Sequence, residues 1–195
     1  MNIETPIGRR LSDCTFGPTE IFLLCENRIP LATQRSWIRD RRILTPVLRP
    51  AAGAKRWMTL ANALEFFILG WPLYQNFEWL VRHALVHEIF SMPAESSIQE
   101  TVELVFEEDE FLPARSGSDT SGAVRFDISV NVDAPLKAFR QNLMALIENR
   151  SASIAEAPCL TDILNNRHFS GHLSADQREQ FNLSVAAAES LIENA

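Results

Sequence analysis

Arginine is concentrated in one short stretch of the chain. Arg35, Arg39, Arg41 and Arg42 lie within eight residues. Arg35, Arg39 and Arg42 recur at spacings of four and three, which places them on one face of a helix. Guanidinium groups suit phosphates and base edges, because each offers several hydrogen-bond donors and keeps its charge. The pattern indicates binding to an acidic partner, with duplex DNA favoured.

The charge of the chain is divided unevenly along its length. The net charge is −7, yet residues 1–60 hold ten basic and five acidic residues, a balance of +5. The other 135 residues hold eight basic and twenty acidic residues, a balance of −12. Such asymmetry suggests a basic binding module joined to an acidic body. It is also compatible with two faces of one protein that attract each other.

Two short helices are predicted to position the arginines. Pro18 suits the first turn of a helix whose apolar face extends to Cys25. Residues 27–30 break this helix, and a second helix is predicted from Leu31 to about Arg42. Two short helices joined by a tight turn are typical of a helix-turn-helix, in which the second helix enters the major groove of DNA.

A small wing is predicted after the second helix. Residues 47–57 read as strand, turn and strand, with Gly53 in the turn. Thr59 can then cap a third helix, which Gly70 ends.

These residues resemble the winged-helix core shared by MerR-type regulators and phage-type excisionases. Those families show T-x-R-x-W/Y-x-R near the end of the second helix, an L-x-P segment, a glycine-containing wing and an R-Y/W-T/S motif. The resemblance covers about 45 of the 195 residues. One departure is that Arg41 replaces the glycine usually found before the L-x-P segment. The matching residues, in order, are Thr33, Arg35, Trp37, Arg39, Leu44, Pro46, Gly53, Arg56 and Trp57.

The resemblance implies a set of DNA-binding residues. The second helix would contact bases or phosphates, and the wing would contact backbone phosphate or the minor groove. Trp37 and Trp57 are interpreted as core residues that lock the helix to the wing. The expected DNA-binding residues are Thr33, Arg35, Arg39, Arg41 and Arg42 on the helix and Arg49, Lys55 and Arg56 in the wing.

The rest of the chain predicts an α+β fold. The expected order after the winged helix-turn-helix is an amphipathic helix, an antiparallel β-hairpin and C-terminal helices. We expect two domains: a DNA-binding domain at 1–70, and an acidic α+β body at 71–195 that oligomerises or binds a partner. The predicted elements of this body are a helix over 71–92, strands over 101–106 and 122–132, a helix from Asp133, an irregular stretch over 151–170 with at most one short helix near 160–164, and a helix from Ser174 to about Glu193.

No catalytic or cofactor motif is present, and a metal-dependent enzyme that uses the four histidines is the third and least favoured hypothesis. His83 and His87 are four residues apart, as are His168 and His172, but no cysteine or HExxH pattern supports a zinc site. The three cysteines show no CxxC spacing. No apolar run approaches the roughly 18–20 residues that cross a bilayer, and no signal peptide is evident, so a cytoplasmic location is expected.

The sequence favours a DNA-binding regulator, either a transcription factor or an excisionase-like factor. Helix 31–42 would read the major groove and wing 47–57 would contact phosphates, while the acidic body forms a homodimer or binds a partner. The alternative is an interaction adaptor or antiactivator whose basic face binds an acidic protein. Neither function requires an enzyme activity.

Overall fold

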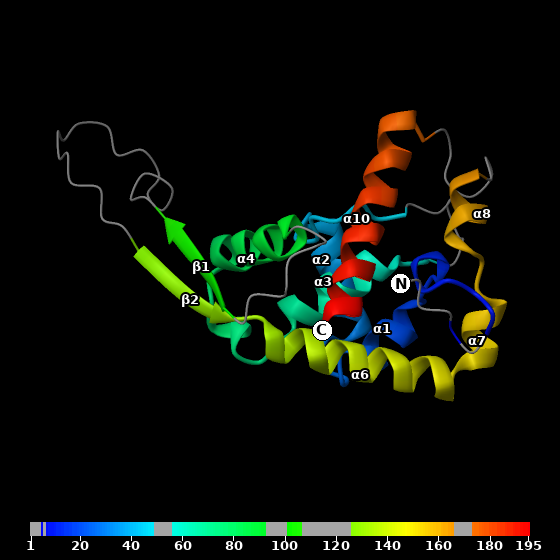
Figure 1. The fold of residues 1–195 in the computed structure, drawn as a ribbon, viewed down its shortest axis with the longest axis horizontal. Helices are drawn as coiled ribbons and strands as arrows, with labels where there is room; N and C mark the ends of the chain where they lie inside the picture. The colour runs from blue at the N-terminus through cyan, green and yellow to red at the C-terminus, as the bar shows by residue number, and fades with distance from the viewer. Residues whose placement is uncertain (1–4, 6, 49–55, 93–100, 107–125, 166–172) are drawn as a thin grey trace.

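The computed structural model describes residues 5, 7–48, 56–92, 101–106, 126–165 and 173–195 (Figure 1). The described chain is α+β: it is mostly helical, with one two-stranded antiparallel sheet. None of its helices combines the length and the hydropathy needed to cross a membrane.

The two helices of the predicted helix-turn-helix are present. A 3-10 turn at Leu11–Asp13 precedes α1 at Pro18–Leu24, and α2 spans Leu31–Arg39. Pro18 takes the first turn of α1, as expected. The helix predicted to continue to about Arg42 therefore ends three residues earlier.

The early end of α2 has a clear backbone cause. Arg41 has φ of 54°, in the left-handed region. The Arg42 N–H donates to the Trp37 carbonyl at 2.8 Å, and the Arg41 N–H donates to Ile38 at 3.3 Å. This pair of bonds is the Schellman motif, which commonly has glycine at the left-handed position. Arg41 thus takes a conformation that glycine favours.

The structure does not show the predicted strands of the wing at the residues that it describes. Residues 47–48 and 56–57 are not in strands, and Met58 instead forms an isolated bridge with Phe16. The turn between them, which includes Gly53, lies outside the described residues.

Helix α3 spans Leu60–Leu69 and is buried along its whole length. Thr59 accepts a hydrogen bond from the Asn62 N–H, and the Asn62 side chain accepts one from the Thr59 N–H. This reciprocal cap satisfies two backbone donors and fixes where the helix starts. The predicted third helix and its Thr59 cap are confirmed.

The single helix predicted over 71–92 is wrong. A 3-10 turn at Tyr74–Asn76 comes first, and α4 spans only Trp79–Ser91. Phe77 lies between them with extended backbone, and its carbonyl accepts a hydrogen bond from Arg82 Nε at 2.8 Å. Leu73 and Leu80 would belong to the apolar face of the predicted amphipathic helix, but they are 69% and 42% exposed.

The β-hairpin is confirmed where it is described. Strand β1 at Thr101–Phe106 pairs with β2 at Phe126–Asn131 in antiparallel register, with Val102 opposite Val130. Val102, Leu104 and Val130 are buried, whereas Ser129 is exposed, as alternation predicts. Residues 122–125 of the predicted second strand lie outside the described residues. In Figure 1 the hairpin projects from the helical body beside α4.

The C-terminal helices include one that the sequence did not predict. Helices α6 and α10, the latter with its Ser174–Gln177 capping box, match the predictions. Helix α8 covers the predicted short helix, but α7 occupies part of the stretch expected to be irregular. The bounds are Asp133–Asn149 for α6, Ser151–Glu156 for α7, Leu160–Asn165 for α8 and Ala175–Asn194 for α10.

One continuous apolar core joins these elements. Helix α3 lies at its centre and contacts α1, α4, α6 and α10 (Figure 1). The rings of Phe67 in α3 and Phe139 in α6 meet edge-to-face, with centroids 5.3 Å apart. The predicted boundary at residue 70 therefore passes through this core. The division into two domains stays a prediction.

Candidate nucleic-acid interface

Helix α2 has a docked face and a solvent face. Gln34 is buried, and its Nε2 donates to the carbonyls of Pro18 and Ile29 at 3.1 Å each. Trp37 is half-buried and stacks on Phe66, with centroids 5.9 Å apart and planes within 6°. Because these contacts hold the inner face, Arg35 and Arg39 are exposed on the outer one.

The turn between α1 and α2 is also shaped by residues in the left-handed region. Glu26 and Asn27 have φ of 54° and 63°. The Asn27 N–H donates to Phe22 and the Glu26 N–H donates to Leu23, both at 2.9 Å. Helix α1 thus also ends in a Schellman motif without glycine. The turn between the two helices therefore depends on Glu26 and Asn27 holding a left-handed backbone conformation, which most residues disfavour.

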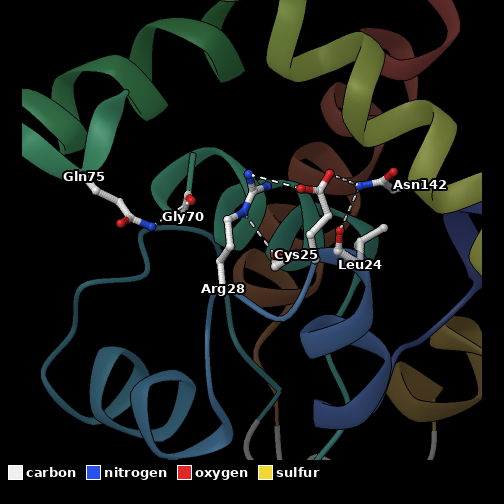
Figure 2. Close-up of polar contacts among 7 residues, drawn as sticks. Leu24, Cys25, Arg28, Gly70, Gln75 and Asn142 are labelled. Atoms are coloured by element: carbon white, nitrogen blue, oxygen red, sulfur yellow. Dashed lines mark hydrogen bonds and ion pairs between the residues drawn. The ribbon is translucent and has the colours of Figure 1, made fainter. Parts of the chain in front are cut away.

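Side chains anchor this turn to the body (Figure 2). Arg28 Nε donates to the Cys25 carbonyl at 3.1 Å, and its guanidinium forms an ion pair with Glu26 at 3.4 Å. Asn142 of α6 donates to Glu26 Oε1 at 2.9 Å and to the Leu24 carbonyl at 3.3 Å. Arg28 is therefore committed to the fold and is not available to a ligand.

The guanidinium of Arg28 also lies over two aromatic rings. Its carbon is 5.2 Å from the ring centroids of both Phe67 and Trp71. One terminal nitrogen, Nη2, is buried without a hydrogen-bond partner among the described residues. Cation–π attraction compensates part of the cost of burying this charge.

The segment after α2 is held by a buried carboxylate. Glu65 of α3 accepts hydrogen bonds from the Leu44 N–H at 2.6 Å, the Thr45 N–H at 2.9 Å and the Thr45 hydroxyl at 2.5 Å. Asn62 Nδ2 adds bonds to Thr45 Oγ1 at 2.7 Å and to the Pro46 carbonyl at 3.0 Å. Burial raises the pKa of Glu65, and these hydrogen bonds oppose the rise. The sequence did not predict this anchor, although an acid inside the apolar run 60–69 is a signal for it.

The arginines at the end of α2 have different surroundings. Arg39 is 76% exposed, and its Nε lies 2.8 Å from Asp40 Oδ1. A hydrogen bond from Arg39, and to a smaller extent one from Ser36, lowers the pKa of Asp40. Arg41 is exposed, whereas Arg42 is half-buried with its guanidinium carbon 4.4 Å from the Trp79 ring centroid.

The structure describes six of the eight expected DNA-binding residues. Four basic residues lie on α2 or just after it, whereas Thr33 and Arg56 are half-buried. Arg49 and Lys55 lie outside the described residues. In the part of the chain that the structure describes, no carboxylate from residues 71–195 forms an ion pair with any of these four: Arg35, Arg39, Arg41 and Arg42.

The structure describes one of the two histidine pairs, His83 and His87. His83 Nε2 lies 3.1 Å from the Arg42 carbonyl, and His87 lies beside Glu88. His168 and His172 are outside the described residues. No group of three or more His, Cys, Asp or Glu side chains that could hold a metal occurs among the described residues.

Comparison of the chain with protein-family models and with curated proteins finds no match. The likeness to MerR-type regulators and excisionases thus rests on the motif residues between Thr33 and Trp57. What the geometry adds is a helix whose basic residues face solvent and a turn fixed by hydrogen bonds.

Proposed function

We propose that this protein is a sequence-specific DNA-binding regulator that acts by binding, without catalysis. Helix α2 would lie in the major groove and present Arg35 and Arg39 to bases and phosphates. Arg41 and Arg42 would contact the flanking backbone, and residues 47–57 would contact phosphates as a wing. The acidic body would form a homodimer or bind a partner.

The exposed face of α2 carries this proposal. Arg35 and Arg39 point to solvent from a helix whose opposite face is packed on α1 and α3. Arg39 pairs only with Asp40 among the described residues, and such an exposed pair is weak and easily exchanged for a phosphate. A rigid helix with exposed guanidinium groups is suited to reading a groove, because little order must be created on binding.

A fluorescence-polarisation titration on duplex DNA at several salt concentrations tests the proposal. About six phosphate contacts would give a slope of about −5 in log affinity against log salt concentration. The double variant Arg35→Ala/Arg39→Ala should weaken binding by at least about tenfold. Arg140→Ala, an exposed change on α6, is the matched control. No binding at low salt would refute the proposal.

Sequence specificity needs a second measurement. Selection from a random duplex library should enrich one site, and the double variant should lose preference as well as affinity, because base contacts carry the specificity. Binding without any enriched site would reduce the function to non-specific DNA binding.

One observation favours the alternative, a protein-binding adaptor. Leu31 opens α2 and Leu44 follows its end, and they are 40% and 48% exposed. Exposed leucines beside arginines suit a protein partner with an acidic rim better than they suit DNA. Replacing both leucines with serine should leave DNA affinity unchanged if the partner is DNA, and should abolish partner binding if it is a protein.

A further inference from the structure

A cluster of cations and aromatic rings joins the end of α2 to the start of α4. The guanidinium carbons of Arg42 and Arg82 lie 4.4 and 4.8 Å from the centroid of the Trp79 ring. Trp37 meets Trp79 edge-to-face at 5.3 Å, and the His83 ring lies 5.6 Å from it. Residues at the end of α2 and in α4, about forty positions apart in the sequence, thus pack around the indole of Trp79.

Hydrogen bonds hold the members of this cluster in place. Arg82 Nε donates to the Phe77 carbonyl at 2.8 Å, and Arg82 Nη2 donates to the Gln75 carbonyl. The backbone of Arg42 is held by its N–H bond to Trp37 at 2.8 Å and by the contact of its carbonyl with His83 Nε2 at 3.1 Å. A preformed arrangement loses little conformational freedom when it binds a ligand.

The cluster has an excess of positive charge. Neither Arg42 nor Arg82 forms an ion pair with a carboxylate in the described part of the chain. Burial and then the nearby charge of Arg42 lower the pKa of Arg82, and Glu78 offsets this only in part. Asp40, which directly follows α2, is bonded to Arg39 and Ser36 and also interacts with the charge of Arg42. Two like charges that nearby carboxylates compensate only in part favour an anion.

The Arg42 side chain has hydrogen-bond donors that the described residues do not use. The guanidinium of Arg42 makes no hydrogen bond to the described residues, so its contact with the Trp79 face leaves its in-plane donors for a ligand. A stacked guanidinium offers two parallel N–H groups, which match two oxygens of a phosphate.

We propose that Arg42 and Arg82 clamp a backbone phosphate of duplex DNA at the junction of α2 and α4, with Trp79 as their common support. This inference rests on the proposed function. Arg42 follows Arg39 by three residues, so a phosphate held here lies beside the end of the helix placed in the groove. The clamp adds Arg82, from the acidic part of the chain, to the DNA-binding surface and fixes the register of α2 on the duplex.

The test measures affinity and salt dependence on full-length protein with the selected duplex and with a scrambled one. Arg42→Gln should weaken binding to both duplexes by the same factor, about five- to tenfold, and should make the salt slope shallower by about 1. Arg82→Lys keeps a charge but loses the planar guanidinium and its bonds to the Phe77 and Gln75 carbonyls, and should give a smaller loss in the same direction. Arg140→Gln on α6 is the control, and circular dichroism checks that each variant is folded.

The outcomes separate the two proposals. Wild-type protein that fails to bind either duplex overturns both. In a second outcome, wild-type protein binds DNA and Arg35→Ala/Arg39→Ala weakens the binding. If Arg42→Gln and Arg82→Lys then leave affinity and salt slope unchanged, the clamp alone is overturned. A loss confined to the selected duplex would make Arg42 a base-reading residue and would also overturn the clamp.

Discussion

Arg41 carries backbone strain at the end of the helix that we place in the groove. It takes the left-handed conformation that ends α2, where a Cβ is unfavourable. Arg41→Gly should therefore be more stable than Arg41→Ala by about 1 kcal/mol, because both lose the side chain and only glycine relieves the backbone. Urea unfolding of the two variants measures the difference. Equal stabilities would mean that the surrounding hydrogen bonds, not the backbone preference, decide the helix end.

Glu65 makes stability depend on pH. Its pKa is raised in the folded protein, mainly by burial, so the folded state binds a proton more readily than the unfolded chain. The stability from this group is fully present below the pKa of an unfolded glutamate and is lost as pH rises through the folded pKa. The free energy of unfolding of wild type minus that of Glu65→Gln should therefore fall as pH rises from about 4.

Urea unfolding over a series of pH values measures this difference. Glu148→Gln, an exposed change on α6, is the matched control. A difference that grows with pH would mean that the hydrogen bonds from Leu44 and Thr45 outweigh burial in setting the pKa of Glu65.

The sequence predicted the elements whose signals are local. The Thr59 and Ser174 caps mark the starts of α3 and α10, and alternation marks the hairpin. The predicted start of α4 was wrong because the apolar pattern of the sequence continues through residues 71–77. In the structure, the Arg82 side chain holds Phe77 in extended backbone, and the helix begins after it. The cluster around Trp79 could not be predicted, because nothing in the sequence indicates that α2 and α4 meet.

At the scale of elements, Gly70 fixes how the turn between α1 and α2 docks on α3. A Cβ at Gly70 would lie 2.5 Å from Ile29 Cδ1 and 3.1 Å from the Phe66 carbonyl oxygen. Gly70→Ala should lower the free energy of unfolding by about 1–3 kcal/mol, because the turn must move. Adding Ile29→Val removes the nearest atom and should recover part of the loss. Thermal unfolding of the single and double variants checks this, and a double variant as unstable as the sum of both changes would contradict it.

At the scale of the molecule, the basic and acidic parts of the chain are joined by more than the core. Arg9 Nη1 donates to the Ala157 carbonyl at 2.6 Å and its Nη2 donates to Ala155 at 2.7 Å, at the end of α7. Thr15 donates to the Pro158 carbonyl at 2.7 Å, and Ser153 donates to Glu20 at 3.0 Å. The basic N-terminal part and the acidic C-terminal part of the chain are therefore joined by hydrogen bonds as well as by the core.

These contacts between the two parts of the chain predict one cooperative unfolding transition. Two of the four tryptophans, Trp37 and Trp57, lie before residue 70, and Trp71 and Trp79 follow it but pack on Phe67 and Trp37. Tryptophan fluorescence therefore reports the region around α2 and α3, whereas much of the circular dichroism comes from α6 and α10. Because Phe67 and Phe139 pack across the predicted boundary, both probes should give the same midpoint in urea. Phe139→Ala should lower both midpoints together, by about 3–5 kcal/mol in free energy of unfolding, since the fully buried ring leaves a cavity. Arg140→Ala beside it should change neither. If Phe139→Ala shifted only the circular dichroism, the region around α2 and α3 would unfold separately from α6 and α10, and one cooperative transition would be ruled out.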